Sequence, residues 1–466
     1  MPEHITPNAI NFQKVTEAAP RYRYLRMVMS NLNTASFTLQ PTASQLLEWK
    51  LPSTDVYNLS KSYIEYSASV AAASDPGYNV LHEDVPAFFN SIQLATSSGV
   101  SLCDLQNANN YLKVKQRQDV KNADFLTADA YEALYPSNQL AATNLRATST
   151  VYQAGNLFGA VAGTTWTGIV NYLEPQHVKV SAVEAGASES VMTQVRQYPL
   201  DIFTDTILGM DRDLYLPTDM YLRVNCFAPK LGFNTTSANA FAAGNSGTLN
   251  GGVTFSNVVL FLAIEQNGQI TESIRERVIK GGLKFQIPYT MTFRNSTAGA
   301  GSAGVQIQFN SGHGKSIRKI LHAPFNVTES GNTAFDCSNW NGSKITSYGT
   351  YMNSKKLQDQ DISCLQATGT SIGMDDWLFN KKYYKNSVVA NGGQYQQNWG
   401  HTDTFAEPND EHSGVPEENV VDGYPLNEPA IWTMNANVTA SLNHYTFVTF
   451  LRDVVIDNRG QNVMVY

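Results

Sequence analysis

Charged side chains are scarce in this chain of 466 residues. They make up 15% of it, against about 25% in an average soluble domain. Asn, Ser, Thr, Gln and Gly supply most of the polar surface instead. The net charge of −8 argues against a chain that binds nucleic acid over most of its surface. Low charge lowers the cost of burying outer faces against neighbouring molecules, and it is equally typical of a β protein with long neutral loops.

Cysteines and long apolar runs are also scarce. The four cysteines form no Cys-x-x-Cys pair and no zinc-ligand spacing with His, so we expect free, mostly buried thiols and a reducing compartment. The first residues, MPEHITPNAINFQ, have no apolar core, so we expect no secretion signal. No run of about 18 apolar residues occurs, so we expect no membrane-spanning helix. The cysteines are Cys103, Cys226, Cys337 and Cys364.

One short motif suggests nucleotide binding. The stretch SGHGKSIRKILHAPF (311–325) contains Gly314-Lys315-Ser316, the end of a phosphate-binding loop. Such a loop needs a glycine five positions before Gly314, but Phe309 stands there, and the following residues alternate like a strand. A turn that joins two antiparallel strands explains the motif better.

Two further patterns suggest an enzyme or an ion site. GTSIG (369–373) matches the nucleophile elbow at Ser371, but the elbow belongs to a parallel α/β sheet, and helical signals are few here. HTDTFAEPNDEH (401–412) gathers two His and four carboxylates, in what reads as a solvated polar loop. We therefore predict that the chain is not an enzyme and has no catalytic residue, no cofactor and no metal.

Strand signals dominate the rest of the chain. In several segments β-branched and aromatic residues alternate with polar ones, the period that puts one side of a strand on a core. Helical signals occur only at 122–136, 271–282 and 373–386, and long irregular stretches at 154–170, 230–252 and 386–430. The predicted strands are 35–41, 63–73, 88–98, 220–229, 255–266, 283–294, 304–310, 316–325 and 444–457.

The two halves of the chain resemble each other weakly. Each half has a strand that opens with Ser-Ile, in NSIQLATSS (90–98) and KSIRKILHAP (315–324). Each closes with an apolar strand that stops at Asn and Gly, VVLFLAIEQNG and FLRDVVIDNRG. We therefore predict two copies of one β-sandwich. The predicted division is an N-terminal arm at 1–29, a first sandwich at 30–270, a linker at 271–282 and a second sandwich at 283–466.

Two phrases carry a resemblance to a known family. RQYPLDIFTDTILGMDRDLYLPTDMYLRVNCF (196–227) and the final HYTFVTFLRDVVIDNRGQNVMVY resemble the double jelly-roll major capsid proteins of the adenovirus, tectivirus and virophage lineage. The chain looks most like the coats of polinton-like viruses and virophages. The resemblance implies an all-β fold of two tandem eight-stranded jelly-roll β-sandwiches, with a few short helices in loops.

The resemblance also implies a function. Three chains would form a homotrimer, a pseudo-hexameric capsomer that tiles the icosahedral shell of a double-stranded DNA virus. Its partners would be neighbouring capsomers, penton proteins and minor capsid proteins. The protein would be assembled inside the host cell and would reside in the virion.

The candidate interface residues lie in two places. Near the start of the chain, a basic and aromatic cluster would dock beneath a neighbouring subunit, and the arm that carries it could also touch a genome or an inner membrane. In the loop 386–430, two aromatic residues are candidate anchors. The candidates are Arg21, Tyr22, Arg23, Tyr24, Tyr395 and Trp399.

Three alternatives stay open at this point. A penton or minor capsid protein is the first, although a penton protein usually needs only one jelly roll. A secreted or surface β-sandwich that binds carbohydrate is the second, although it would predict a signal peptide and disulfides. An enzyme built around Ser371 is the third.

Overall fold

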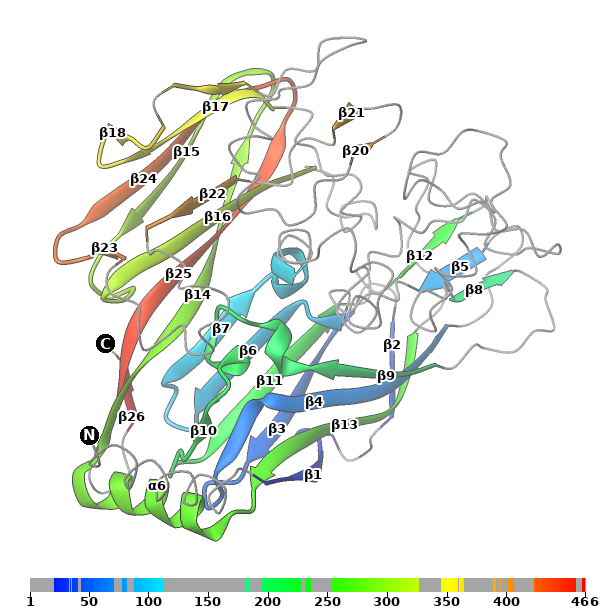
Figure 1. Cartoon of the computed structure of the whole chain (residues 1–466). Coiled ribbons are helices and arrows are strands. Elements are labelled where there is room, and N and C mark those ends of the chain that lie inside the picture. The colour runs from blue at the N-terminus through cyan, green and yellow to red at the C-terminus, as the bar shows by residue number, and fades with distance from the viewer. Residues whose placement is uncertain are drawn as a thin grey trace.

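The described part of the chain consists mainly of β-strands arranged in two sandwiches (Figure 1). The structure is a computed structural model of the chain. It describes residues 21–32, 34, 36–40, 43–70, 78–81, 88–112, 181–184, 194–227, 232–235, 253–326, 345–358, 360–363, 389–390, 394–395, 401–405, 423–457 and 463–465.

The first sandwich has two antiparallel sheets. One has the order β1 (Tyr22–Val28), β13 (Val253–Glu265), β4 (Tyr57–Val70) and β10 (Asp213–Leu214), with β2 (Phe37–Leu39) on β13 and β9 (Gln194–Pro199) on β4. The other has the order β3 (Ser44–Leu51), β11 (Met220–Phe227), β6 (Ser91–Thr96) and β7 (Ser101–Gln106). The short helices η3 (Leu200–Ile202) and η4 (Ile207–Gly209) lie between β9 and β10.

The second sandwich is built in the same way. One sheet has the order β14 (Leu283–Thr297), β25 (Leu442–Ile456), β16 (Ser316–Asn326) and β22 (His401–Thr404), with β23 (Tyr424–Pro425) on β16 and β26 (Val463–Val465) on β25. The other has the order β15 (Gly301–Phe309), β24 (Ala430–Val438), β17 (Ile345–Met352) and β18 (Lys355–Lys356), with β19 (Ile362–Ser363) also on β17.

Both sandwiches have the same strand topology. If β9 with β10, β18 with β19 and β22 with β23 are each counted as one interrupted strand, each sandwich has eight principal strands. Their order in one sheet is first, eighth, third and sixth, and in the other second, seventh, fourth and fifth. This is the arrangement of a jelly roll. The chain is therefore a double jelly roll, as the sequence predicts.

Two small sheets lie outside the jelly rolls (Figure 1). β12 (Gly232–Thr235), β5 (Tyr78–Leu81) and β8 (Ser181–Glu184) form one, and β20 (Val389–Ala390) and β21 (Gln394–Tyr395) form the other.

Each of the nine predicted strand segments overlaps a strand of the structure. The alternation behind the prediction is plain in β11, MYLRVNCF, in which every second side chain is buried. β25 is different, because ten consecutive residues from Leu442 are buried. Continuous burial indicates a strand that is covered on both faces. The predicted helices at 122–136 and 373–386 lie outside the described residues.

The predicted helix between the halves is α6 (Gly268–Gly281), three residues longer at its start than the sequence suggests. Asn267 caps it, because its side-chain Oδ1 accepts a hydrogen bond from Gln269 N at 3.0 Å. Gly282 ends it with a positive φ of 70° and donates its N–H to Val278 O. The helix connects β13 to β14 and so joins the two jelly rolls (Figure 1).

The structure changes the expected start of the first sandwich. Residues 22–28, which the sequence assigns to an arm, are strand β1 and pair with β13 from Tyr22 opposite Glu265 to Val28 opposite Val259. Leu25 and Met27 point toward the core of the first sandwich and pack against it. This inward pattern makes the segment a strand of the first jelly roll, while residues 1–20 lie outside the described residues.

Two hydrophobic clusters hold the jelly rolls together. The cluster of the second jelly roll surrounds Trp432 and Phe450. The cluster of the first surrounds Trp49 and Phe255, and it continues into the second jelly roll through residues such as Phe447. Cys103 is a buried free thiol in the first cluster, and burial raises its pKa to about 12. Cys226 is also buried and free, whereas Cys337 and Cys364 lie outside the described residues.

Candidate interfaces and buried polar clusters

The first jelly roll covers one outer face of the second. This face consists of β14, β25 and β16, whose registers place Thr292, Phe447 and Leu321 in one row. Phe447 is 1% exposed and Leu321 is fully buried. Tyr111, from a helical turn that follows β7, packs edge-on against Phe447 with 5.3 Å between ring centroids. An apolar face of one jelly roll is thus sealed by the side of the other.

An ion pair lies in the same contact. Lys319 Nζ of the second jelly roll is 2.6 Å from Asp205 Oδ2 of the first, and the two side chains are only 18% and 21% exposed. Tyr111 donates its hydroxyl to the same oxygen at 2.5 Å, and Thr290 Oγ1 donates to Asp205 O at 2.7 Å. Charge-assisted bonds of this kind are directional, so they restrict the angle between the jelly rolls as well as holding them together.

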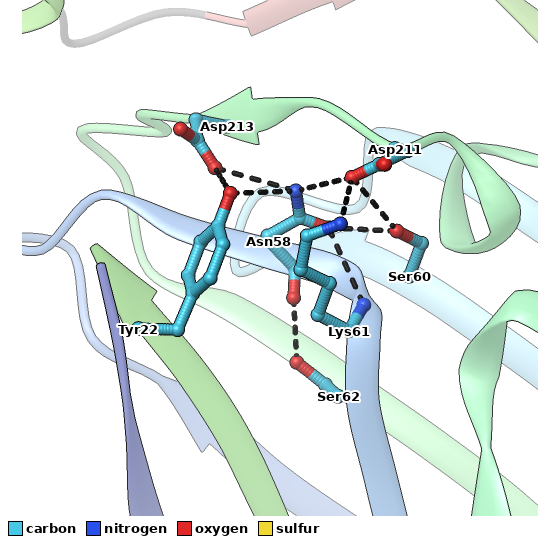
Figure 2. Close-up of polar contacts among 7 residues, drawn as sticks. All are labelled: Tyr22, Asn58, Ser60, Lys61, Ser62, Asp211 and Asp213. Atoms are coloured by element: carbon cyan, nitrogen blue, oxygen red, sulfur yellow. Dashed lines mark hydrogen bonds and ion pairs between the residues drawn. The ribbon is translucent and has the colours of Figure 1, made fainter. Parts of the chain in front are cut away.

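The start of the chain is held by a polar cluster at one end of the first sheet (Figure 2). Asn58, which is 1% exposed, donates from Nδ2 to Asp211 Oδ1 at 3.0 Å and to Asp213 Oδ1 at 3.3 Å. Tyr22 donates its hydroxyl to Asp213 Oδ1 at 2.8 Å, and Lys61 Nζ pairs with Asp211 at 2.6 Å. This Asn58 cluster comprises Tyr22, Asn58, Ser60, Lys61, Ser62, Asp211 and Asp213.

Both carboxylates of the Asn58 cluster have partners within the cluster, because Asp211 pairs with Lys61 and Asp213 accepts from Tyr22 and Asn58. Partial burial, together with the hydrogen bond to Asp213, raises the pKa of Tyr22. The ammonium group of Lys61 lowers the pKa of Asp211. The cluster therefore binds β1, β4 and β10 to one another, and Tyr22 is engaged within its own chain.

The other candidates near the start have different surroundings. Arg21 donates its backbone N–H to Glu265 Oε1 at 2.9 Å, while its side chain and that of Arg23 are exposed. Tyr24 is 50% exposed and packs edge-on against Tyr63, 5.4 Å away. Tyr63 in turn stacks on Phe261 at 4.9 Å. The structure thus places Tyr24 in an aromatic row across β1, β4 and β13.

The remaining two candidates come from the predicted loop 386–430. Tyr395 lies in β21, opposite Val389 of β20. Trp399 lies outside the described residues, as does Ser371.

The segment HTDTF at 401–405 is corrected by the structure from a solvated loop to a strand. His401, Thr402 and Asp403 are buried in β22, which pairs with β16. His401 Nε2 lies 2.8 Å from Asp403 Oδ1, and Trp432 donates its indole N–H to Asp403 Oδ2 at 2.8 Å. Burial alone would raise the pKa of Asp403, but His401 and these hydrogen bonds hold it below its usual value.

The Asp403 network continues into β17. Thr350 Oγ1 donates to Asp403 Oδ1 at 3.1 Å, and Tyr348 OH lies 3.1 Å from His401 Nδ1. The sequence gives no sign of these two contacts, because Thr350 and Tyr348 each lie 53 residues before their partner in β22. No group of three His, Cys, Asp or Glu side chains that could hold a metal occurs among the described residues.

A second buried network pairs two histidines. His322 Nε2 lies 3.1 Å from His444 Nδ1. The outer nitrogens have hydroxyl partners, with Thr446 Oγ1 2.9 Å from His322 Nδ1 and Thr297 Oγ1 3.0 Å from His444 Nε2. Burial lowers the pKa of His444 to about 4. The pKa of His322 is also lowered, mainly by burial and to a smaller extent by the nearby His444 and His401. Neutral imidazoles suit the pair, because one nitrogen donates and the other accepts.

The Gly-Lys-Ser motif follows a turn between two strands, as the sequence predicts, but these strands do not form the predicted antiparallel pair. The turn connects β15 to β16, which belong to different sheets of the second jelly roll and are not hydrogen-bonded neighbours. Gly314 packs so closely on β25 that a Cβ atom there would lie 2.9 Å from Leu451 O and from Phe450 Cβ. Lys315 donates its backbone N–H to Leu451 O at 2.8 Å. The absence of a side chain at Gly314 therefore allows the turn to pack directly against β25.

Comparison with solved structures identifies the fold. The chain superposes on the VP54 protein of the virus PBCV-1, solved for fitting into a reconstruction of the virophage Sputnik, with a TM-score of 0.53 and 10% identity over 96% of this chain and 97% of that one. A chain from the cryo-EM structure of the Sputnik virophage gives a TM-score of 0.52 and 11% identity over 92% of this chain and 87% of that one.

These similarities span both jelly rolls and establish the fold. No family model and no curated protein matches the sequence. In the part of the chain that the structure describes, no helix is both long and apolar enough to cross a bilayer.

Proposed function

We propose that this chain is the major capsid protein of an icosahedral virus. The observation that carries the proposal is the duplication itself. Two jelly rolls with the same strand order are fixed side by side in one chain, and the whole arrangement superposes on a chain of the Sputnik particle. Its role is structural, and its place is the shell of the virion, which is assembled inside the host cell.

The proposed assembly unit is a homotrimer. Three chains with two similar jelly rolls each provide six similar blocks, and six blocks in a ring make a pseudo-hexagonal unit that can tile a shell. The ion pair of Lys319 and Asp205 supports this proposal, because a shell needs the two blocks of one chain to keep a fixed angle. Neighbouring capsomers, penton proteins and minor capsid proteins would meet the outer walls of this unit.

The division of the chain follows the same scheme. We place the boundary between the jelly rolls at α6, and the start of the first jelly roll at β1. Arg21 and Arg23 remain candidates for contact with a neighbouring subunit, because both side chains are exposed at this end of the sheet.

The mass of the purified protein in solution tests this proposal. Light scattering after size exclusion should give about 154 kDa, three times the 51.3 kDa of the chain. Negative-stain images of the same peak should show a six-lobed outline. A particle of 51.3 kDa that stays monomeric at high protein concentration would contradict the proposal.

A further inference from the structure

The two jelly rolls differ in what covers one equivalent face. In the second, the outer face of the first, eighth and third strands (β14, β25 and β16) is buried under the first jelly roll. The strands in the same places of the first jelly roll are β1, β13 and β4. Their outer face remains partly exposed, so the same side of the same fold is sealed in one copy and open in the other.

The open face carries aromatic and apolar side chains beside a few charged ones. The registers place Arg26, Phe261 and Tyr63 in one row across β1, β13 and β4. The sealed row of the second jelly roll runs across the equivalent strands, and its central strand also carries a phenylalanine, Phe447. We call Tyr24, Val28, Tyr63 and Phe261 the outer aromatic face.

The side chains of the two faces differ in their exposure to solvent. Tyr24 is 50% exposed and Val28 is 59% exposed, whereas Phe447 at the sealed face is 1% exposed. Among the described residues, five large apolar side chains are exposed, and two of them lie on β1 at this face. Large, rigid aromatic side chains that lie together on a surface are typical anchors of protein interfaces.

The surface that seals the second jelly roll also has an equivalent. The sealing surface includes β7, the fifth strand of the first jelly roll, with Tyr289 OH of β14 3.4 Å from Ser101 Oγ of β7. The fifth strand of the second jelly roll is β18 with β19. It lies at the edge of its sheet, and Lys355 and Asp361 beside it are exposed.

We infer that the outer aromatic face of one chain docks against the β18–β19 edge of a second copy, so that the contact between chains repeats the contact within the chain. A patch that meets a different patch on the next copy forms a heterologous interface, which closes into a ring when the rotation allows. The inference rests on the proposed function and adds the surfaces through which the trimer forms.

The charges of the two surfaces allow this pairing. Arg26 and Glu65 flank the outer aromatic face, and the edge carries Lys355 and the ion pair of Lys356 with Asp361, whose Nζ and Oδ1 are 2.7 Å apart, so both signs of charge occur at each surface. Such rim charges orient the partners, while the aromatic side chains contribute most of the affinity.

Photo-cross-linking tests the inference directly. A benzophenone amino acid is placed at position 24 of the full chain, and unlabelled chains are mixed with ¹⁵N-labelled chains during reassembly. A matched control carries the same amino acid at position 279, because Ile279 is 59% exposed and lies on α6, which belongs to neither surface. We expect position 24 to cross-link to residues 345–363 in a chain of the other isotope, and position 279 to give no cross-link to that segment.

Two substitutions that each introduce a carboxylate, one in the outer aromatic face and one on α6, give a second measurement. Tyr24→Glu should raise the concentration at which the assembly dissociates by about tenfold or more, because a carboxylate would be buried in the contact. Ile279→Glu should leave it unchanged, and thermal melting of both variants checks that each is folded.

The outcomes separate the inference from the proposed function. If the wild-type protein is a trimer but position 24 cross-links to another segment, the inference is wrong and the capsomer proposal stands. If Tyr24→Glu assembles as well as wild type, the inference is again wrong. A monomeric wild-type protein would overturn both.

Discussion

Acid should destabilise the second jelly roll through its buried histidine pair. His322 and His444 face each other at 3.1 Å, and both pKa values lie below the ordinary 6.5. The unfolded chain therefore binds protons at a higher pH than the folded chain does. Between the two values the unfolded state carries more protons, so the free energy of unfolding falls as the pH falls from 6.5 toward 4.

The size of the effect follows from the pKa of His444. A change from 6.5 in the unfolded chain to about 4 in the folded chain corresponds to about 3 kcal/mol. His322 adds to this in the same direction. Asp403, the other titratable group in this core with a shifted pKa, has a pKa below 3.8, so its contribution is lost only at lower pH.

Urea unfolding between about pH 7 and pH 4 measures this loss. Trp432 reports on the region, because its ring lies 5.7 Å from that of His322. The variant His444→Gln should lose much of the pH dependence, since glutamine does not titrate, while His313→Gln on the β15–β16 turn should keep it. Equal pH dependence in wild type and His444→Gln would refute the reasoning.

Three further substitutions test other contacts. Lys319→Met should lower the free energy of unfolding by about 2 kcal/mol, because it leaves the partly buried Asp205 without its cation. Gly314→Ala should cost about 1–3 kcal/mol in the same measurement, because the added Cβ would be 2.9 Å from backbone and side-chain atoms of β25. Trp432→Phe should cost about 2 kcal/mol or more, because it removes the indole donor to the buried Asp403.

Matched controls distinguish these effects from general sensitivity. Lys280→Met removes an ion pair with Glu276 in which the side chains are 72% and 52% exposed, and should change stability by less than about 0.5 kcal/mol. Gly281→Ala adds a Cβ with no atom within 4 Å. If a control lowers the melting temperature as much as its partner variant, the stated contact is not the cause.

The strands could be predicted from local sequence. Which strand of the first jelly roll corresponds to which strand of the second could be predicted only in part. The closing strands β13 and β25 are paired correctly by their apolar runs, and both are eighth strands. The Ser-Ile similarity is misleading, because β6 is the fourth strand of its jelly roll and β16 is the third. A short local phrase does not determine which strand lies beside which, since pairing is decided by contacts far apart in the chain.

The buried polar groups could not be predicted for a related reason. HTDTF looks solvated because its composition is polar, yet His401 and Asp403 are buried by mutual hydrogen bonds and by Trp432. Burial of polar groups depends on such partners, and a linear sequence does not show them. Strand β1 was easier to foresee in part, because Leu25 and Met27 alternate toward the core, but the arginines before and between them suggest a free arm.

Electron cryomicroscopy of the purified assembly, viewed end-on, tests the central claim most directly. The account predicts a particle of three chains with six similar blocks, so that low-resolution averages show sixfold symmetry and higher-resolution averages reduce it to threefold. A twofold particle, or one in which the two jelly rolls of a chain lie far apart, would contradict the account.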